Sequence, residues 1–88
     1  MKTIWKYDLE TTDYQTLSIP LPAKILSVSN QGMQIVLYAE VNTESRLMRD
    51  VAVWMHGTGH ERKALDTAEF IGTVKLMNGT LMFHVYVV

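Results

Sequence analysis

The chain has 88 residues, a formal net charge of −1 and no cysteine. This length predicts a single domain, since two independent cores would each be too small to fold without metals or disulfides, and it leaves little room for an extended catalytic cleft. The lack of cysteine excludes disulfides, thiolate metal sites and a cysteine nucleophile, and the basic residues are scattered among the carboxylates, so nucleic-acid binding is not expected.

The N-terminal segment MKTIWKYDLE mixes charged and apolar residues where a signal peptide would need a continuous apolar stretch. No window of the chain approaches the roughly 18 apolar residues of a membrane-spanning helix. We therefore expect a soluble, cytoplasmic protein without a membrane partner.

The first half of the chain alternates apolar and polar residues with a period of two, which predicts strands. Trp5, Tyr7 and Leu9 alternate with charged residues, so we expect a first strand that turns these three side chains to the core. Alternation over residues 16–19 predicts a short edge strand that ends at about Pro20, because proline removes a hydrogen-bond donor from the sheet.

A hairpin is predicted next, from a strand over residues 23–30, a turn at Asn30-Gln31-Gly32 and a returning strand over residues 33–41. The returning strand places five apolar side chains on its core face: Met33, Ile35, Leu37, Ala39 and Val41.

The middle of the chain predicts one central strand between two polar connections. Residues 42–50 are polar and fit a wide loop or a bent strand connection. Residues 51–55, VAVWM, are apolar on both faces, which is typical of the middle of a sheet or of a barrel strand that a loop covers. Residues 57–68 have few apolar side chains and predict a loop, with a single helical turn at residues 61–65 as the alternative.

A second hairpin is predicted from residues 69–77 and 80–88 around Asn78-Gly79, because this dipeptide tolerates positive φ at both turn positions. Seven short antiparallel strands without a helical segment then predict an all-β fold. We expect one domain over residues 1–88, either a small barrel or a compact two-sheet sandwich.

Three blocks of this chain resemble a known family in order and spacing: MKTIWKYDLE with QTLSIPLPAKILSV, then GTGH, then FIGTVKLMNGTLMFHVY. The family comprises small uncharacterised proteins of tailed bacteriophages and prophages. It has no established activity, so the resemblance assigns no residue a role. It implies an accessory protein in an infected or lysogenic bacterium, of the kind that binds a host protein and inhibits a host pathway or a defence such as CRISPR or restriction.

The segment His56-Gly57-Thr58-Gly59-His60 raises the question of a metal or phosphate site. His56, His60, Glu61 and the distant His84 offer zinc ligands, but the two glycines disfavour the helix that would aim histidines at one ion. In extended geometry the first two lie roughly 13 Å apart. The segment also lacks the lysine of a phosphate-binding loop. We therefore predict no metal or cofactor.

The glycines are better explained by the backbone: Gly57 marks a bulge or a close backbone approach at a strand end, Gly59 takes a positive φ, and Thr58 bonds the local backbone. His56 and His60 then point in different directions. Histidine is a common general base, but the loop histidine, His60, has no nucleophile to activate, so no catalytic residue is predicted.

Aromatic side chains form the second group of candidate residues. Exposed rings on a sheet can stack nucleobases, but such surfaces interleave basic residues, and these strands mostly do not. The outward positions of three strands are too apolar to be left bare on a monomer. The chain also ends in the apolar strand HVYVV, whose edge must be paired, covered or buried in an oligomer.

We therefore predict a protein interface, either a homodimer seam or the face that binds a host partner. Its residues are Tyr38, Trp54, His60, Met82, His84 and Tyr86. Two other hypotheses for the function stay open. One is a small-ligand module that holds a nucleotide or metal at GTGH. The other is a virion structural or assembly protein, which would form symmetric oligomers.

Overall fold

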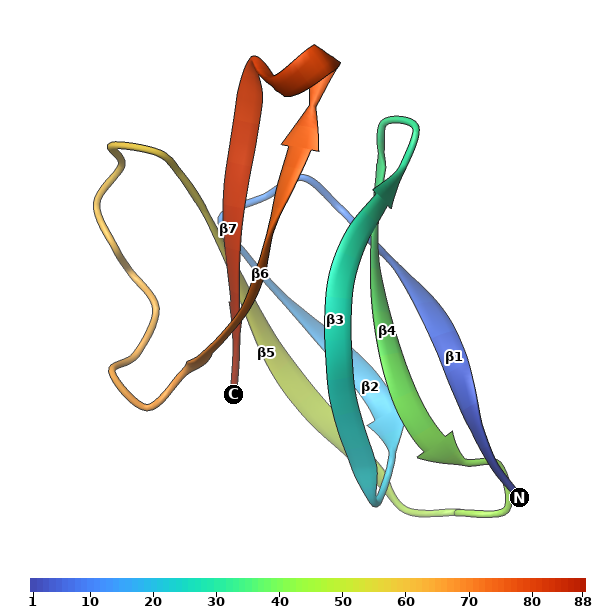
Figure 1. The fold of residues 1–88 in the computed structure, drawn as a ribbon. Coiled ribbons are helices and arrows are strands. Elements are labelled where there is room, and N and C mark those ends of the chain that lie inside the picture. The colour runs from blue at the N-terminus through green and yellow to red at the C-terminus, as the bar shows by residue number, and fades with distance from the viewer.

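Seven strands form two antiparallel sheets that pack face to face in the computed structural model, which describes residues 1–88 (Figure 1). The three-stranded sheet has the order β1-β4-β3, and the four-stranded sheet has the order β2-β5-β7-β6. The strands are β1 (Lys2–Leu9), β2 (Tyr14–Pro20), β3 (Ala23–Gln31), β4 (Gln34–Asn42), β5 (Met48–Gly57), β6 (Glu69–Leu76) and β7 (Leu81–Val87). The predicted all-β fold is confirmed in its sandwich form, and the barrel alternative is wrong because no strand pairing joins the two sheets.

The core lies between the sheets and is made by alternate residues of each strand. In β5, for example, Val51, Val53 and Met55 are buried while Ala52 and Trp54 face outward. The same inward positions on the other strands complete one cluster: Leu9, Ile19, Ile35, Leu37, Ala39, Val41, Val74, Leu76, Val85 and Val87. Period-two alternation thus leaves every other side chain of the four-stranded sheet on its outer face.

The central strand and the C-terminal strand both lie inside the four-stranded sheet. β5 pairs with β2 and β7, as its apolar character on both faces predicts. β7 pairs with β5 and β6, so both edges of this apolar strand are paired within the sheet, and the strand needs no oligomer to cover them. β2 is an edge strand that ends at Pro20, as expected.

Both predicted hairpins form, but their turns differ from the prediction. Gln31 pairs with Gln34, so the first turn is Gly32-Met33, and Met33 is an exposed turn residue rather than a core residue. Leu76 pairs with Leu81, which makes the second connection a four-residue loop that includes the 3₁₀ turn η1 (Met77–Gly79). Asn78 and Gly79 have positive φ as predicted, but Met77 also does. No helical segment is long or apolar enough to cross a membrane.

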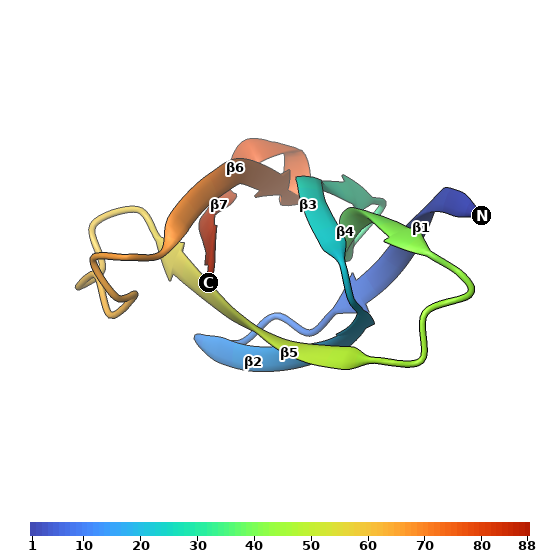
Figure 2. The same cartoon turned by 90° about the horizontal axis from the view of Figure 1, so that it is seen from below.

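The two sides of the sandwich differ in how closely the sheets approach each other (Figure 2). On one side β3 packs against β6 where both strands carry a bulge, and a Cβ atom at Gly72 would lie 3.0 Å from Val28 Cγ1. On the other side β1 makes few contacts with the four-stranded sheet. Trp5 lies on this open side and is 41% exposed, so its predicted burial is wrong.

Tyr7 of β1 carries a buried polar group that has no hydrogen-bond partner. Its side chain packs against the core, and its hydroxyl is buried without a hydrogen-bond partner. Burial accordingly raises the pKa of Tyr7 above its ordinary value of 10.0.

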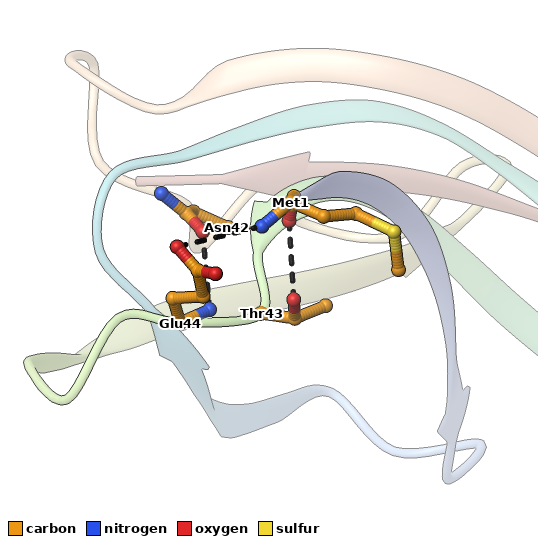
Figure 3. Close-up of polar contacts among 4 residues, drawn as sticks. All are labelled: Met1, Asn42, Thr43 and Glu44. Carbon is orange, nitrogen blue, oxygen red and sulfur yellow. Dashed lines mark hydrogen bonds and ion pairs between the residues drawn. The ribbon is translucent and has the colours of Figure 1, made fainter.

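The first residue continues the pairing of β1 with β4 beyond the strand (Figure 3). The Thr43 amide and hydroxyl donate to the Met1 carbonyl at 2.9 and 3.2 Å. Asn42 Oδ1 accepts from the Met1 ammonium and from the Glu44 amide, at 3.3 and 3.0 Å, and thereby fixes the start of the β4–β5 loop.

Candidate functional site

A row of aromatic side chains crosses the outer face of the four-stranded sheet, one ring from each strand. Trp54 of β5 pairs with Tyr14 of β2 on one side and with Tyr86 of β7 on the other, and Tyr86 pairs with Phe70 of β6. We call these four residues the aromatic row. Strand register, which brings residues from positions 14 to 86 side by side, creates this surface.

In two of the three neighbouring pairs of the aromatic row the rings meet at steep angles. Tyr14 and Trp54 have centroids 5.2 Å apart and an interplanar angle of 54°, and Phe70 and Tyr86 are 5.4 Å apart at 61°. Such tilted and edge-to-face contacts are favourable geometries for aromatic pairs. The two ends of the row, Tyr14 and Phe70, are each 51% exposed, so the row keeps a solvent-accessible apolar surface.

The loop over residues 58–68 folds back onto this outer face beside the row. His56 of β5 is only 7% exposed, and its Nε2 accepts hydrogen bonds from the backbone amides of Lys63 and Ala64, at 3.2 and 3.1 Å. Ala64 is buried as a result. Because Nε2 accepts both bonds, the His56 ring proton lies on Nδ1.

Two charged side chains of the loop reach its neighbours. The Arg62 guanidinium lies 4.9 Å from the centre of the Tyr86 ring, a cation–π contact with the aromatic row. Lys63 Nζ lies 3.7 Å from a carboxylate oxygen of Asp13, just before β2. The loop is thus tied to β5, to β7 and to the start of β2.

His84 of β7 is held between two threonines on the same face. Its Nδ1 is 2.9 Å from Thr73 Oγ1 of β6, and its Nε2 is 2.9 Å from Thr58 Oγ1. With both ring nitrogens engaged, His84 fixes the start of the loop to β6 and β7. It is a structural contact of the face.

The HGTGH segment forms a tight turn in which the His60 amide donates to the Gly57 carbonyl at 3.1 Å. Gly59 has φ +85°, as predicted. The predicted bulge or close backbone approach at Gly57 is wrong, because Gly57 pairs regularly with Phe83 and its close neighbour is a side chain, the His60 ring, which would lie 2.9 Å from a Cβ atom there. The prediction that Thr58 bonds local backbone is wrong, because its hydroxyl reaches His84.

This turn brings the two histidines of the segment to one pocket, which extended geometry did not predict. His56 and His60 line a pocket of about 320 Å³. The remaining lining residues are Asp13, Met55, Glu61 and Lys63. Nowhere in the chain do three histidine or acidic side chains converge as metal ligands.

Four of the six predicted interface residues lie on the outer face of the four-stranded sheet: Trp54, Met82, His84 and Tyr86. His60 lies in the turn at the edge of the same face. Tyr38 does not join them, because β4 belongs to the other sheet and its outward residues face the opposite side of the molecule.

Three residues of this face, Tyr14, Phe70 and Arg62, were not predicted from the sequence. A signal for Tyr14 existed: alternation through Leu17 and Ile19 places it on the outward face of its strand. The outward position of Phe70 could not be predicted, because the bulge between Phe70 and Gly72 breaks the alternation. Arg62 lies in a loop whose path no pattern predicts.

These features define a small two-sheet β-sandwich that presents an aromatic outer face bordered by a loop. The chain belongs to the family of the domain of unknown function DUF7352, which matches residues 1–88. No curated protein and no solved structure matches the chain.

Proposed function

We propose that this protein is a non-enzymatic accessory protein of a bacteriophage that acts in the host cytoplasm by binding a host protein through the aromatic row. The phage context rests on the resemblance of three sequence blocks to a family of phage proteins. A host pathway or defence system is the expected target.

The observation that carries the proposal is the row of Tyr14, Trp54, Tyr86 and Phe70 on the outer sheet face, in which the two end rings are exposed and the two central rings are partly buried. Tyrosine, tryptophan and arginine are the residues that most often dominate protein interfaces, and Arg62 contacts the row. The steep ring angles and the single neighbouring cation favour a protein over stacked nucleobases, which need exposed ring faces and a basic groove.

Capture from a host lysate tests the proposal with two matched variants. Trp54→Lys places a charge in the aromatic row, and Tyr38→Lys places the same charge on the opposite outer face. Proteins bound by the immobilised wild type and by each variant are quantified by mass spectrometry, and circular dichroism checks that both variants fold. We expect a partner that wild type and Tyr38→Lys retain and that Trp54→Lys loses. Recovery of chaperones alone, or equal recovery by both variants, contradicts the proposal.

A second candidate function is the binding of a small organic ligand in the pocket between His56 and His60. The Nδ1–H of His56 has no hydrogen-bond partner in the protein, and the pocket that His56 lines also carries charged groups of both signs, Asp13, Glu61 and Lys63. Thermal-shift measurements against nucleotides and divalent metals test this function. A shift with one compound that His60→Ala abolishes supports it, and a flat response across the set removes it.

A further inference from the structure

The sandwich has four edge strands, and they are not equally protected. β3 and β6 pack against each other on the closed side, where Gly72 permits the close contact with Val28. The edges of β1 and β2 remain free. An unpaired strand edge presents backbone donors and acceptors to any other strand, and proteins usually protect such edges with charges, prolines or bulges.

The open edge of β2 exposes the backbone of alternate residues. The Met55 amide donates to the Asp13 carbonyl, so odd-numbered residues of β2 bond to β5. In an antiparallel ladder the residues between them point their amides and carbonyls the other way. Tyr14, Thr16 and Ser18 therefore direct their backbone groups to solvent, and Pro20 ends the row without a donor.

The open edge of β1, by contrast, is protected by charged residues. The Thr43 amide donates to the Met1 carbonyl, so the even-numbered residues of β1 face its open edge. Three of these four residues, Lys2, Lys6 and Asp8, carry charges. The outward residues of β2 carry none, and β2 has no bulge in its pairing with β5.

We propose that β2 is the seam of a homodimer, in which it pairs antiparallel with β2 of a second copy. The exposed backbone groups are symmetric about Thr16. Thr16 of one copy pairs with Thr16 of the other on the twofold axis, and Tyr14 of each copy pairs with Ser18 of the other. The twofold axis places one copy of Pro20 at each end of the seam, and the pairing stops there because proline has no backbone donor. A twofold seam is self-complementary, which is the usual form of a dimer interface.

The dimer joins the two four-stranded sheets into one continuous sheet and places both copies of Tyr14 beside the seam. The aromatic rows of the two copies then lie on one outer face, which offers a partner two equivalent surfaces. Since the seam consists of a few backbone pairs, we expect weak association, with a dissociation constant of about 1 µM to 1 mM.

Sedimentation of the full chain over this concentration range tests the seam. Thr16→Lys and Thr16→Glu each place like charges opposite each other at the twofold axis, so each alone should weaken the dimer by several-fold to about tenfold. Because the two charges attract across the same axis, an equimolar mixture of the variants should recover association. Ser29→Lys, an exposed change on β3, is the matched control and should sediment as the wild type does.

Recovery of association in the mixture would show that Thr16 lies opposite Thr16, because a general effect of added charge would not depend on which charges face each other. The proposal is overturned if the wild type remains monomeric at about 1 mM, or if Thr16→Lys dimerises as the wild type does. It is also overturned if the mixture fails to recover, or if Ser29→Lys dissociates as strongly as Thr16→Lys.

Discussion

The two outer faces of the sandwich are built by the same alternation but have different surfaces. On the three-stranded sheet, Tyr38 lies between Lys6 and Ser27, so its ring has no aromatic neighbour across the strands. On the four-stranded sheet, Trp54 lies between Tyr14 and Tyr86. Alternation decides which residues face outward, and register decides whether the apolar ones become a contiguous surface.

Alanine substitution in the aromatic row should give the largest difference between the faces. Trp54→Ala should weaken binding of the captured partner by about 2 kcal/mol or more, roughly 30-fold, as expected for a central interface residue. Tyr38→Ala should change the affinity by less than about 0.5 kcal/mol. Isothermal titration calorimetry measures both, and equal losses would remove the distinction between the faces.

The loop that covers part of one face depends on His56. His56→Phe leaves the amides of Lys63 and Ala64 without their acceptor, which should lower the free energy of unfolding by about 1–3 kcal/mol. Denaturant titration measures this loss, and hydrogen exchange should show faster exchange of both amides. His60→Ala, a change in the exposed turn, is the control. Unchanged protection of the two amides in His56→Phe would show that the loop is held by other contacts.

The contact between the loop and the aromatic row should contribute less. Arg62→Ala removes the cation over Tyr86, together with the hydrogen bond to the Leu65 carbonyl and the exposed ion pair with Asp66, and should lower the free energy of unfolding by about 0.5–1 kcal/mol. Arg62→Lys should recover part of this loss because it keeps the charge. A loss in Arg62→Lys as large as in Arg62→Ala would mean that contacts particular to the guanidinium, such as its hydrogen bond to the Leu65 carbonyl, matter here rather than the charge.

Tyr7 lies between the two faces and should give the smallest effect at neutral pH. Tyr7→Phe removes a buried hydroxyl that has no partner, so stability should be unchanged or rise by up to about 1 kcal/mol. Because burial raises the pKa of Tyr7 above 10.0, the unfolded chain loses this proton first as the pH rises. The free energy of unfolding therefore falls as the pH rises above 10, toward and through the folded-state pKa.

Denaturant titrations between neutral and alkaline pH measure this dependence. Tyr7→Phe should lose part of the alkaline fall in stability, and Tyr38→Phe, the control on the outer face, should retain it. An identical fall in Tyr7→Phe and the wild type would mean that the Tyr7 hydroxyl is hydrated in the folded protein.

Local patterns were sufficient to predict the seven strands and both hairpins. Alternation predicted the extended conformation of β1 and β4, the apolar run VAVWM predicted β5, and Asn78-Gly79 predicted the last hairpin. Details that depend on neighbouring strands were wrong. Trp5 alternates as a core residue does, but it lies on an edge strand that the other sheet leaves partly open.

The aromatic row could be predicted only in part because it depends on which strands are neighbours. β2 and β5 are far apart in the chain, and no local signal indicates that Tyr14 pairs with Trp54. The return of the loop onto His56 is likewise a tertiary contact made by backbone amides, which leave no trace in residue type. Sequence patterns identified the outward residues, and three-dimensional pairing determined which of them lie together.

Chemical-shift mapping by NMR with the captured host partner is the most direct test of the binding face. We predict that adding the partner to labelled protein shifts the Trp54 indole and the amides of the aromatic row while Tyr38 and Lys6 stay in place. Shifts confined to the outer face of the three-stranded sheet, with the aromatic row unchanged, would contradict the account.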